Sequence, residues 1–299
     1  MRHVFIINPA AGKKSPALSF ISTIKEVFSE LQEEYVIRTT SCQGDATKIA
    51  AEEAAKGDTR LYAVGGDGTL LEVASGVEAY PDAELTVIPC GSGNDYVKSY
   101  GGAENFLNLR KLVAGTAKKV DGIRCNNKVS LNLCSIGMDA DVCYHMTDFK
   151  KMPLISGPLA YDLAVLKVLL RPIGSVLDVA METTKGLVKR SGRYLFALAA
   201  NGQYYGGGYH GAPMASTEDG LLDFILIKSV PRLKAITLLG KYKRGEHMDL
   251  DICEHFVGTA MDVHCDGGAC VNADGEIEKG EDTRFEIVPK YFNFVVPKA

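Results

Sequence analysis

The chain has 299 residues, 46% of them hydrophobic, and a formal net charge of −4. This length allows one large domain or two of ordinary size, and the mildly acidic balance argues against a nucleic-acid partner, which would favour a basic domain. The eight cysteines form no recognisable disulfide framework, and we find no signal peptide and no apolar run long enough to span a membrane. We therefore expect a soluble cytoplasmic protein.

The first third of the chain alternates strand-like and helix-like segments. The spacing of apolar residues predicts helices over 15–34 and 45–56. The expected strands are 4–8, 35–40, 61–64 and 85–88. Such alternation is typical of a parallel sheet with helices on both faces, in which ligands bind beyond the carboxyl ends of the strands. We predict an α/β first domain.

From about residue 124 the pattern changes to the period-two alternation of β-strands. Strands are expected at 128–133, 176–183, 194–201, 221–228, 259–265, 283–288 and 291–296, with helices near 159–170 and 231–243. This pattern predicts a second, mainly antiparallel β domain.

Two glycine-rich runs, 65–69 (Gly-Gly-Asp-Gly-Thr) and 91–95 (Gly-Ser-Gly-Asn-Asp), each follow a predicted strand. A glycine turn between a strand and a helix exposes backbone N–H groups to an anion, and the helix dipole adds to their positive potential. Asp67 and Asp95 would repel a bare phosphate, so they suggest a magnesium–nucleotide site. The alternative is a pair of ordinary tight turns.

Together with Asn8-Pro9 after the first strand, these runs resemble the diacylglycerol kinase catalytic family, which includes bacterial soluble diacylglycerol kinases and the sphingosine and ceramide kinases. The resemblance continues along the whole chain through Asn132, 137–140 (Gly-Met-Asp-Ala), Asn201, 206–208 (Gly-Gly-Gly), Pro213, 219–220 (Asp-Gly) and 272–276 (Asn-Ala-Asp-Gly-Glu). It implies a nucleotide-binding α/β domain over 1–122, to which 288–299 return, and a β-rich lipid-substrate domain over 123–287.

The resemblance implies ATP and Mg²⁺ as cofactors, and the first domain can supply their site. Asp67 and Asp95 can handle magnesium directly or through water. The side chains or open backbone available to the nucleotide are those of Asn8, Gly66, Gly68, Thr69, Ser92 and Asn94. The alternatives are a strand-ending turn at Asn8 and a helix N-cap at Asn94 and Asp95.

Asp274 and Glu276 are the candidates for the second half of the site. Alternation along a strand would place both carboxylates on one face, where one acts as a general base and the other orients the hydroxyl or holds metal-bound water. Asp-Gly is also a common hairpin turn. The resemblance implies that Asp274 is the base, but the sphingosine kinases favour the aspartate of the first glycine turn, so Asp67 stays a candidate.

The resemblance also implies a structural magnesium site in the second domain, held by the Asp219 carboxylate and the carbonyls of Ser216 and Leu221. Magnesium prefers oxygen ligands and retains water. The bacterial pattern has lysine where this chain has Ser216, which a carbonyl ligand tolerates. The alternative is a type I turn. We expect Asp139 to be a turn or supporting residue.

A membrane-facing element is expected between residues 150 and 171. Apolar residues from Met152 to Leu169 are flanked there by Lys150, Lys151, Lys167 and Arg171. Basic groups over an apolar face suit an anionic interface, although an ordinary core helix with solvated lysines has the same pattern.

The predicted protein is an ATP-dependent lipid kinase that makes peripheral contact with the inner membrane face, with diacylglycerol the favoured acceptor and phosphatidic acid the product. A sphingoid base, ceramide or phosphatidylglycerol remain open as acceptors. The alternatives are an NAD kinase, whose family shares the Gly-Gly-Asp-Gly turn, and a nucleotide-binding regulatory module without catalysis. Family membership would also allow a homodimer.

Overall fold

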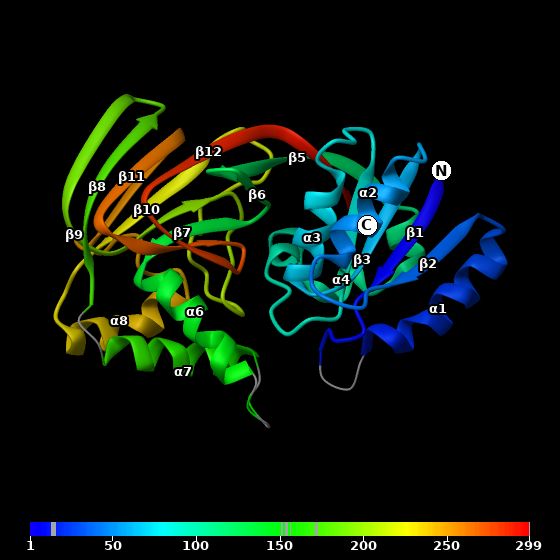
Figure 1. The fold of residues 1–299 in the computed structure, drawn as a ribbon, viewed down its shortest axis with the longest axis horizontal. Helices are drawn as coiled ribbons and strands as arrows, with labels where there is room; N and C mark the ends of the chain where they lie inside the picture. Colours follow the sequence, from blue (N-terminus) through cyan, green and yellow to red (C-terminus); the bar gives the residue numbers. More distant parts are fainter. Residues whose placement is uncertain (13–15, 151, 153–154, 156, 171–172, 299) are drawn as a thin grey trace. The chain divides into compact units, whose positions relative to one another are not determined.

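The computed structural model describes residues 1–12, 16–150, 152, 155, 157–170 and 173–298. The chain divides into two compact units, Met1–Val120 with Lys290–Ala299, and Asp121–Pro289 (Figure 1). Each junction lies two residues from the boundary expected from the sequence.

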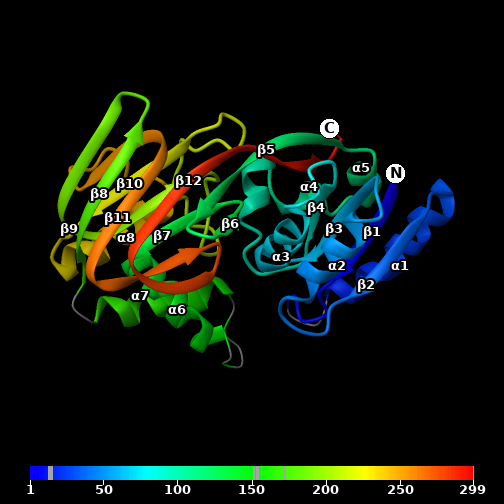
Figure 2. The same cartoon turned by 45° about the horizontal axis from the view of Figure 1, so that its top comes forward.

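The first unit is built on a parallel sheet with the strand order β12–β4–β3–β1–β2. Its strands are β1 (Arg2–Ile7), β2 (Tyr35–Thr39), β3 (Thr59–Gly65), β4 (Glu84–Pro89) and the end of β12 (Glu276–Val296). Figure 2 shows β4, β3, β1 and β2 side by side. All seven residues of β3 are buried, because a parallel sheet is covered on both faces. The last strand joins this sheet where Asn293 and Phe294 pair with β4.

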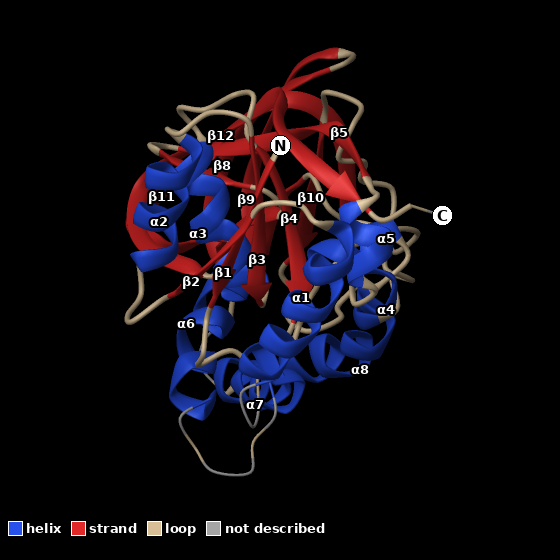
Figure 3. Ribbon diagram, turned by 90° about the vertical axis from the view of Figure 1, so that its right-hand side faces the viewer, coloured by secondary structure: helices blue, strands red, loops and turns tan. Residues whose placement is uncertain are grey.

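Helices cover both faces of this sheet. In Figure 3, α2 and α3 lie on one side of the strands, and α1, α4 and α5 lie on the other. Their bounds are α1 (Pro16–Leu31), α2 (Asp45–Ala54), α3 (Asp67–Val77), the 3₁₀ helix η1 (Tyr96–Tyr100), α4 (Ala103–Phe106) and α5 (Leu109–Val113). The alternation predicted from the sequence is therefore confirmed.

The second unit is mainly antiparallel. Its elements are β5 (Thr116–Cys125), β6 (Lys128–Ser130), β7 (Leu133–Gly137), β8 (Ser175–Thr183), β9 (Gly186–Ala200), β10 (Leu222–Lys228), β11 (Cys253–Ala273) and the first part of β12. The long strands β9 and β11 each pair with β7, β8 and β10. The strands therefore wrap around one apolar core, which includes Leu177, Phe224 and Phe285.

Three helices pack beside these strands: α6 (Met138–Lys150), α7 (Gly157–Leu169) and α8 (Arg232–Lys243). They enclose a second core containing Tyr161, Val165 and Phe196. The sequence predicted α7 and α8 but not α6. Within the described residues, no helix combines the length and apolar character needed to cross a bilayer. All eight cysteines are free thiols.

Candidate functional site

The two glycine turns lie against each other at the carboxyl ends of β3 and β4. The backbone N–H of Cys90 donates to the carbonyl of Gly65 across 2.7 Å. A Cβ on Gly91 would lie only 2.5 Å from the Cα of Gly66. No side chain fits between backbones so close, so glycine is required at Gly91 by the contact itself.

Asp67, at the start of α3, connects the two turns. Its Oδ1 accepts the backbone N–H of Asp95 (2.8 Å) and that of Tyr96 (3.2 Å). Its Oδ2 lies 3.0 Å from the position that a Cβ on Gly93 would occupy, and the Oδ2 of Asp95 lies 3.1 Å from the same point. Two carboxylates therefore converge on one glycine. Lys98 forms an ion pair with the other oxygen of Asp95.

Asn8 and Thr69 interlock beside these carboxylates. The side-chain amide of Asn8 donates to Thr69 Oγ1 (3.0 Å), and its Oδ1 accepts the backbone N–H of Ala10 (3.0 Å). Asn8 therefore forms a turn at the end of β1 and also lies beside the first glycine turn. Gly68, in the first turn of α3, and Ser92 are exposed.

The first turn of α3 is the part of this edge suited to an anion. The first N–H groups of a helix have no intrahelical partner, and the helix dipole makes this end positive. The second glycine turn leads only into the five-residue 3₁₀ helix η1, so α3 supplies the dipole. Asn94 Oδ1 accepts the Gly91 N–H (3.0 Å), and Asp95 makes no side-chain cap. Asp95 thus occupies the N-cap position of η1 without a side-chain cap, so the N-cap alternative holds for its place in the chain only.

In the second unit, Asp274 anchors the segment that connects β6 to β7. Its Oδ2 accepts the N–H groups of Leu131 (2.7 Å) and Asn132 (2.9 Å), and its Oδ1 accepts that of Leu133 (2.9 Å). Burial raises the pKa of Asp274, while the Ser130 hydroxyl and these backbone donors act in the opposite direction. An ionised carboxylate has about four lone-pair positions, so the three backbone donors leave one that a hydroxyl can fill.

The expectation that Asp274 and Glu276 share a strand face is wrong. β11 ends at Ala273 and β12 begins at Glu276, so Asp274 and Gly275 form the two-residue turn between them, with φ of 48° and 99°. Positive φ at both positions is typical of a type I′ hairpin, for which Asp-Gly is favoured. Glu276 instead pairs with Lys128 across 2.8 Å.

Asn201 forms a junction that the sequence motifs did not reveal. Its side-chain amide donates to the carbonyls of Asp121 (3.0 Å) and Leu131 (2.7 Å). Asp121 in turn accepts the Gly220 N–H at Oδ2 (2.7 Å). Since Leu131 also donates to Asp274, one hydrogen-bonded path runs from the Asp274 turn to the turn that contains Asp219.

Asp219 lies in a turn, as the alternative reading predicted. Its Oδ1 accepts the Leu221 N–H (3.0 Å), and Ser216 Oγ accepts that of Glu218 (3.4 Å). Partial burial, with the charges of Asp223 and Asp121, raises the pKa of Asp219. Carboxylates that repel each other in this way favour a nearby cation. In the described part of the chain, no three His, Cys, Asp or Glu side chains form a metal-binding group, so such a cation would depend on carbonyl and water oxygens.

Asp139 is buried and supports the packing of the helices, as expected. Its carboxylate accepts hydrogen bonds from Ser135 (2.6 Å), Tyr161 (2.9 Å) and Tyr205 (2.6 Å). Burial raises its pKa. The Tyr205 hydroxyl also forms a hydrogen bond with that of Tyr242 (2.8 Å). The Asp139 carboxylate of α6 is therefore connected directly to α7, and through Tyr205 to α8.

The stretch expected to face a membrane divides between core and surface. Val165, Val168 and Leu169 are buried in α7, whereas Leu159 is 45% exposed and Leu166 is 51% exposed. Lys167 lies over the ring of Phe149, 5.7 Å from its centroid. Lys151, Leu154 and Arg171, which belong to the same predicted stretch, lie outside the described residues. The core-helix alternative therefore describes the buried face of α7, and membrane contact through its exposed face stays a prediction.

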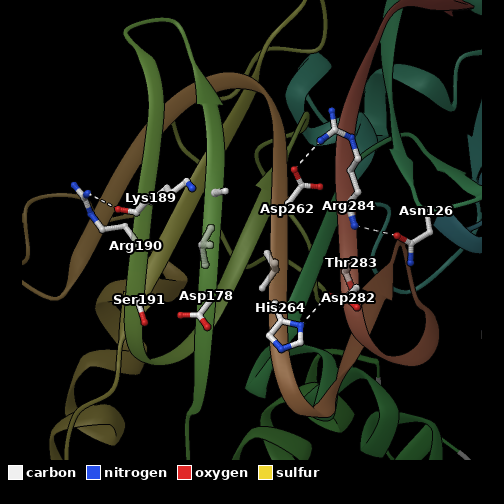
Figure 4. A pocket seen from close by; sticks show the side chains of 13 residues that line it. Asn126, Asp178, Lys189, Arg190, Ser191, Asp262, His264, Asp282, Thr283 and Arg284 are labelled. Carbon is white, nitrogen blue, oxygen red and sulfur yellow. Dashed lines mark hydrogen bonds and ion pairs between the residues drawn. The ribbon is translucent and has the colours of Figure 1, made fainter.

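A hollow of about 710 Å³ is lined mainly by residues of β8, β9, β11 and β12, whose side chains are drawn in Figure 4. Several of its charged side chains already have partners: Arg284 pairs with Asp262 (2.7 Å), and His264 with Asp282 (2.7 Å). No residue that the sequence singled out for catalysis or nucleotide binding lines it.

Comparison with known proteins covers both units. Residues 2–125 match the diacylglycerol kinase catalytic domain, and residues 132–296 match the YegS C-terminal NAD kinase beta sandwich-like domain. The chain is 27% identical over 298 residues to the diacylglycerol kinase of Bacillus subtilis (strain 168), covering 98% of this chain and 95% of that protein. It is 30% identical over 267 residues to a Pseudomonas aeruginosa (PAO1) protein named "Probable lipid kinase YegS-like", covering 87% and 84%.

The fold has a counterpart among crystal structures. A diacylglycerol kinase from Bacillus anthracis str. Sterne matches with a TM-score of 0.73 at 21% sequence identity, covering 99% of this chain and 96% of that one. The α/β unit followed by a β-sandwich-like unit is therefore confirmed as the architecture.

Proposed function

We propose a specific reaction for this chain on the premise that it belongs to the family of diacylglycerol kinases and YegS-like lipid kinases. A kinase of this family transfers a phosphoryl group to a lipid. We infer that the donor is ATP, the acceptor diacylglycerol and the product phosphatidic acid. The match to the Bacillus subtilis diacylglycerol kinase over 98% of the chain supports this acceptor.

One observation carries the proposal: the carboxylates of Asp67, at the start of α3, and of Asp95 converge on Gly93 in the second glycine turn. An anion at the α3 N-terminus would meet two carboxylates, so it needs a cation between them. Phosphoryl transfer uses this combination of phosphate, Mg²⁺ and positioned donors. The backbone of Gly66 and Gly68 would hold the phosphates beside Thr69, whose own N–H donates to the Gly66 carbonyl (3.0 Å), while Asp67 and Asp95 would hold Mg²⁺ directly or through water. Bound Mg²⁺ would neutralise the charge that develops on the transferred group.

Asp274 is the proposed general base. The three backbone N–H groups of residues 131–133 fix its carboxylate, and the remaining lone pair can accept a proton from the lipid hydroxyl. Glu276, paired with Lys128, would orient the acceptor or metal-bound water. Asp67 stays the alternative base.

The Asp219 turn is the proposed second magnesium position. The carboxylate of Asp219 and the carbonyls of Ser216 and Leu221 would be its ligands. The nearby charges of Asp223 and Asp121 support a cation there. Asp219→Ala is expected to lower thermal stability in magnesium, measured by scanning calorimetry with and without EDTA. Equal melting of wild type and variant under both conditions would contradict this site.

Phosphate transfer from radiolabelled ATP to mixed micelles tests the reaction directly. The acceptor panel holds diacylglycerol, a sphingoid base, ceramide and phosphatidylglycerol, with soluble NAD as the control. We expect label on diacylglycerol, dependent on magnesium. Label on another lipid would identify that lipid, rather than diacylglycerol, as the acceptor. Label on NAD alone would contradict a lipid kinase. Nucleotide binding without transfer to any acceptor would indicate a non-catalytic module.

A further inference from the structure

Helix α8 lies in a segment of unusual charge. Between Asp223 and Glu246 the chain carries no acidic residue, although its net charge as a whole is −4. The cations of this segment are Lys228, Arg232, Lys234, Lys241, Lys243 and Arg244. A cationic segment in an acidic protein points to a local anionic partner rather than to a property of the whole surface.

Half of these cations are neutralised within the fold. Lys228 pairs with Glu254 (3.1 Å), Lys243 with Asp162 (3.2 Å) and Arg244 with Glu246 (2.7 Å). Arg232, Lys234 and Lys241 are exposed, and within the described part of the chain no acidic side chain pairs with them. Three cations of α8 are therefore available to a partner.

The same helix also exposes apolar side chains. Its inner face packs Ala235, Leu239 and Tyr242 against the core beneath the helices. On its outer face, Leu233 is 81% exposed and Ile236, one turn further, is 46% exposed. Residues three apart lie on one face of a helix. Leu233 and Ile236 thus form an apolar outer face, and Arg232, Lys234 and Lys241 are exposed on the same helix.

We propose that the outer face of α8 docks on an anionic lipid bilayer; this rests on the proposed function, since the acceptor is a membrane lipid. Leu233 and Ile236 enter the interface between headgroups and acyl chains, while Arg232, Lys234 and Lys241 contact anionic headgroups. An interfacial helix of this kind lies in the plane of the membrane, with its apolar face down and its cations at headgroup level. The element is separate from the stretch at 150–171, where Val165, Val168 and Leu169 are buried and Leu159 and Leu166 are exposed.

Charge favours a bilayer over a second copy of the chain. A symmetric contact through the outer faces of two α8 helices would bring three unpaired cations of each copy together. Like charges placed opposite one another weaken such a contact. An anionic membrane instead supplies opposite charge to all three, together with an apolar layer for Leu233 and Ile236.

Vesicle co-sedimentation without ATP tests the docking independently of turnover. The vesicles are phosphatidylcholine alone, or phosphatidylcholine with about one third phosphatidylglycerol. We expect the wild-type protein to bind only the anionic vesicles. Lys234→Glu should weaken binding at least about fivefold, the amount expected for one cation near the surface. Leu233→Glu with Ile236→Glu should abolish it. Salt at about 1 M, where the Debye length is about 3 Å, should release the wild type.

The matched control is the hairpin between β8 and β9, where Lys185 and Leu187 are also exposed. Lys185→Glu with Leu187→Glu makes the same kinds of change and should leave binding unaltered. Equal binding of the α8 variants and wild type, or loss of binding in the hairpin variant, would overturn the proposal. So would a wild-type dimer in analytical ultracentrifugation that Leu233→Glu dissociates. If anionic vesicles bind through α8 but no lipid is phosphorylated, the proposed function fails and the docking stands.

Discussion

The carboxylate of Asp67 accepts the backbone N–H of Asp95 across 2.8 Å. One side chain from the first glycine turn therefore fixes the backbone of the second. The same oxygen also accepts the N–H of Tyr96, so the position of Asp95 depends on Asp67. A substitution at Asp67 should consequently have two effects, one on charge and one on the geometry of the turns.

These two effects can be separated by comparing Asp67→Asn with Asp67→Ala. The asparagine keeps an oxygen for both N–H groups but removes the charge, whereas alanine removes both. Hydrogen bonds to charged groups contribute about 1.5–3 kcal/mol each, so we expect Asp67→Ala to lose at least that much unfolding free energy in urea, and Asp67→Asn clearly less. Both variants should lose phosphoryl transfer. Equal stability of the two variants would show that the connection between the turns contributes nothing.

Asp274→Asn is expected to reduce turnover about a hundredfold to ten-thousandfold, the usual contribution of a general base. An asparagine can keep two of the three N–H bonds and then presents its NH₂ to the third, so the variant should also lose about 1–3 kcal/mol of unfolding free energy. Because burial raises the pKa of Asp274, the rate of the wild type should fall with decreasing pH above the range of an ordinary aspartate. Turnover at several pH values measures this.

Glu276→Gln is the matched control, since Glu276 is partly exposed and its ion pair with Lys128 is of the kind that contributes little to stability. This variant should keep the acidic fall in rate, and Asp274→Asn should lose it. Should Glu276→Gln abolish the pH dependence instead, Glu276 would replace Asp274 as the base; should Asp67→Asn do so, the base would lie in the first unit.

Asn201→Ala should destabilise the protein more than an ordinary amide deletion. It leaves the carbonyls of Asp121 and Leu131 without their donor, and Asn201 is fully buried. A buried unsatisfied group costs about 1–3 kcal/mol, so the expected loss for the two carbonyls is about 2–6 kcal/mol in urea unfolding. Asn293→Ala is the control: that amide also donates to two carbonyls, but water can replace it. A similar loss for both variants would contradict the role of burial at Asn201.

The glycine turns were predictable because their chemistry is local. A buried strand, a turn that only glycine permits and a helix that begins with Asp67 follow one another directly in the chain. Parallel order then brings the ends of β3 and β4 to the same edge of the sheet. The contact between Gly66 and Gly91 and the bond from Asp67 to Asp95 are consequences of that order, although no short segment contains both partners.

The second unit was harder to predict for two physical reasons. Periodicity cannot distinguish a strand that continues through Asp274 from a hairpin that turns there, and the turn preference of Asp-Gly decided the outcome. The partners of Asn201 lie 80 and 70 residues away in the sequence, so only the folded strands bring them together. Helix α6 was missed because its buried face includes Asp139, whose burial depends on hydroxyl groups from Tyr161 and Tyr205.

Stability should also depend on pH through His247. This side chain is 2% exposed. Its Nε2 faces the carbonyl of Gly211 (3.1 Å), and among the described residues its Nδ1 has no hydrogen-bond partner. Burial lowers its pKa from 6.5 to about 4. Between pH 6.5 and pH 4, His247 is protonated in the unfolded chain but neutral in the folded protein. The free energy of unfolding therefore falls as the pH drops from 6.5 to 4.

The size of this effect follows from the shift. Each unit of pKa corresponds to about 1.4 kcal/mol, so about 3 kcal/mol should be lost through His247 over that range. His247→Gln, which keeps a donor for Gly211, should remove this part of the pH dependence in urea unfolding at several pH values. The exposed His264 gives a control of opposite sign, because its hydrogen bond to Asp282 raises its pKa; its contribution is present at low pH and lost as the pH rises. A pH profile unchanged by His247→Gln would show that His247 is protonated as readily in the folded protein as in the unfolded chain.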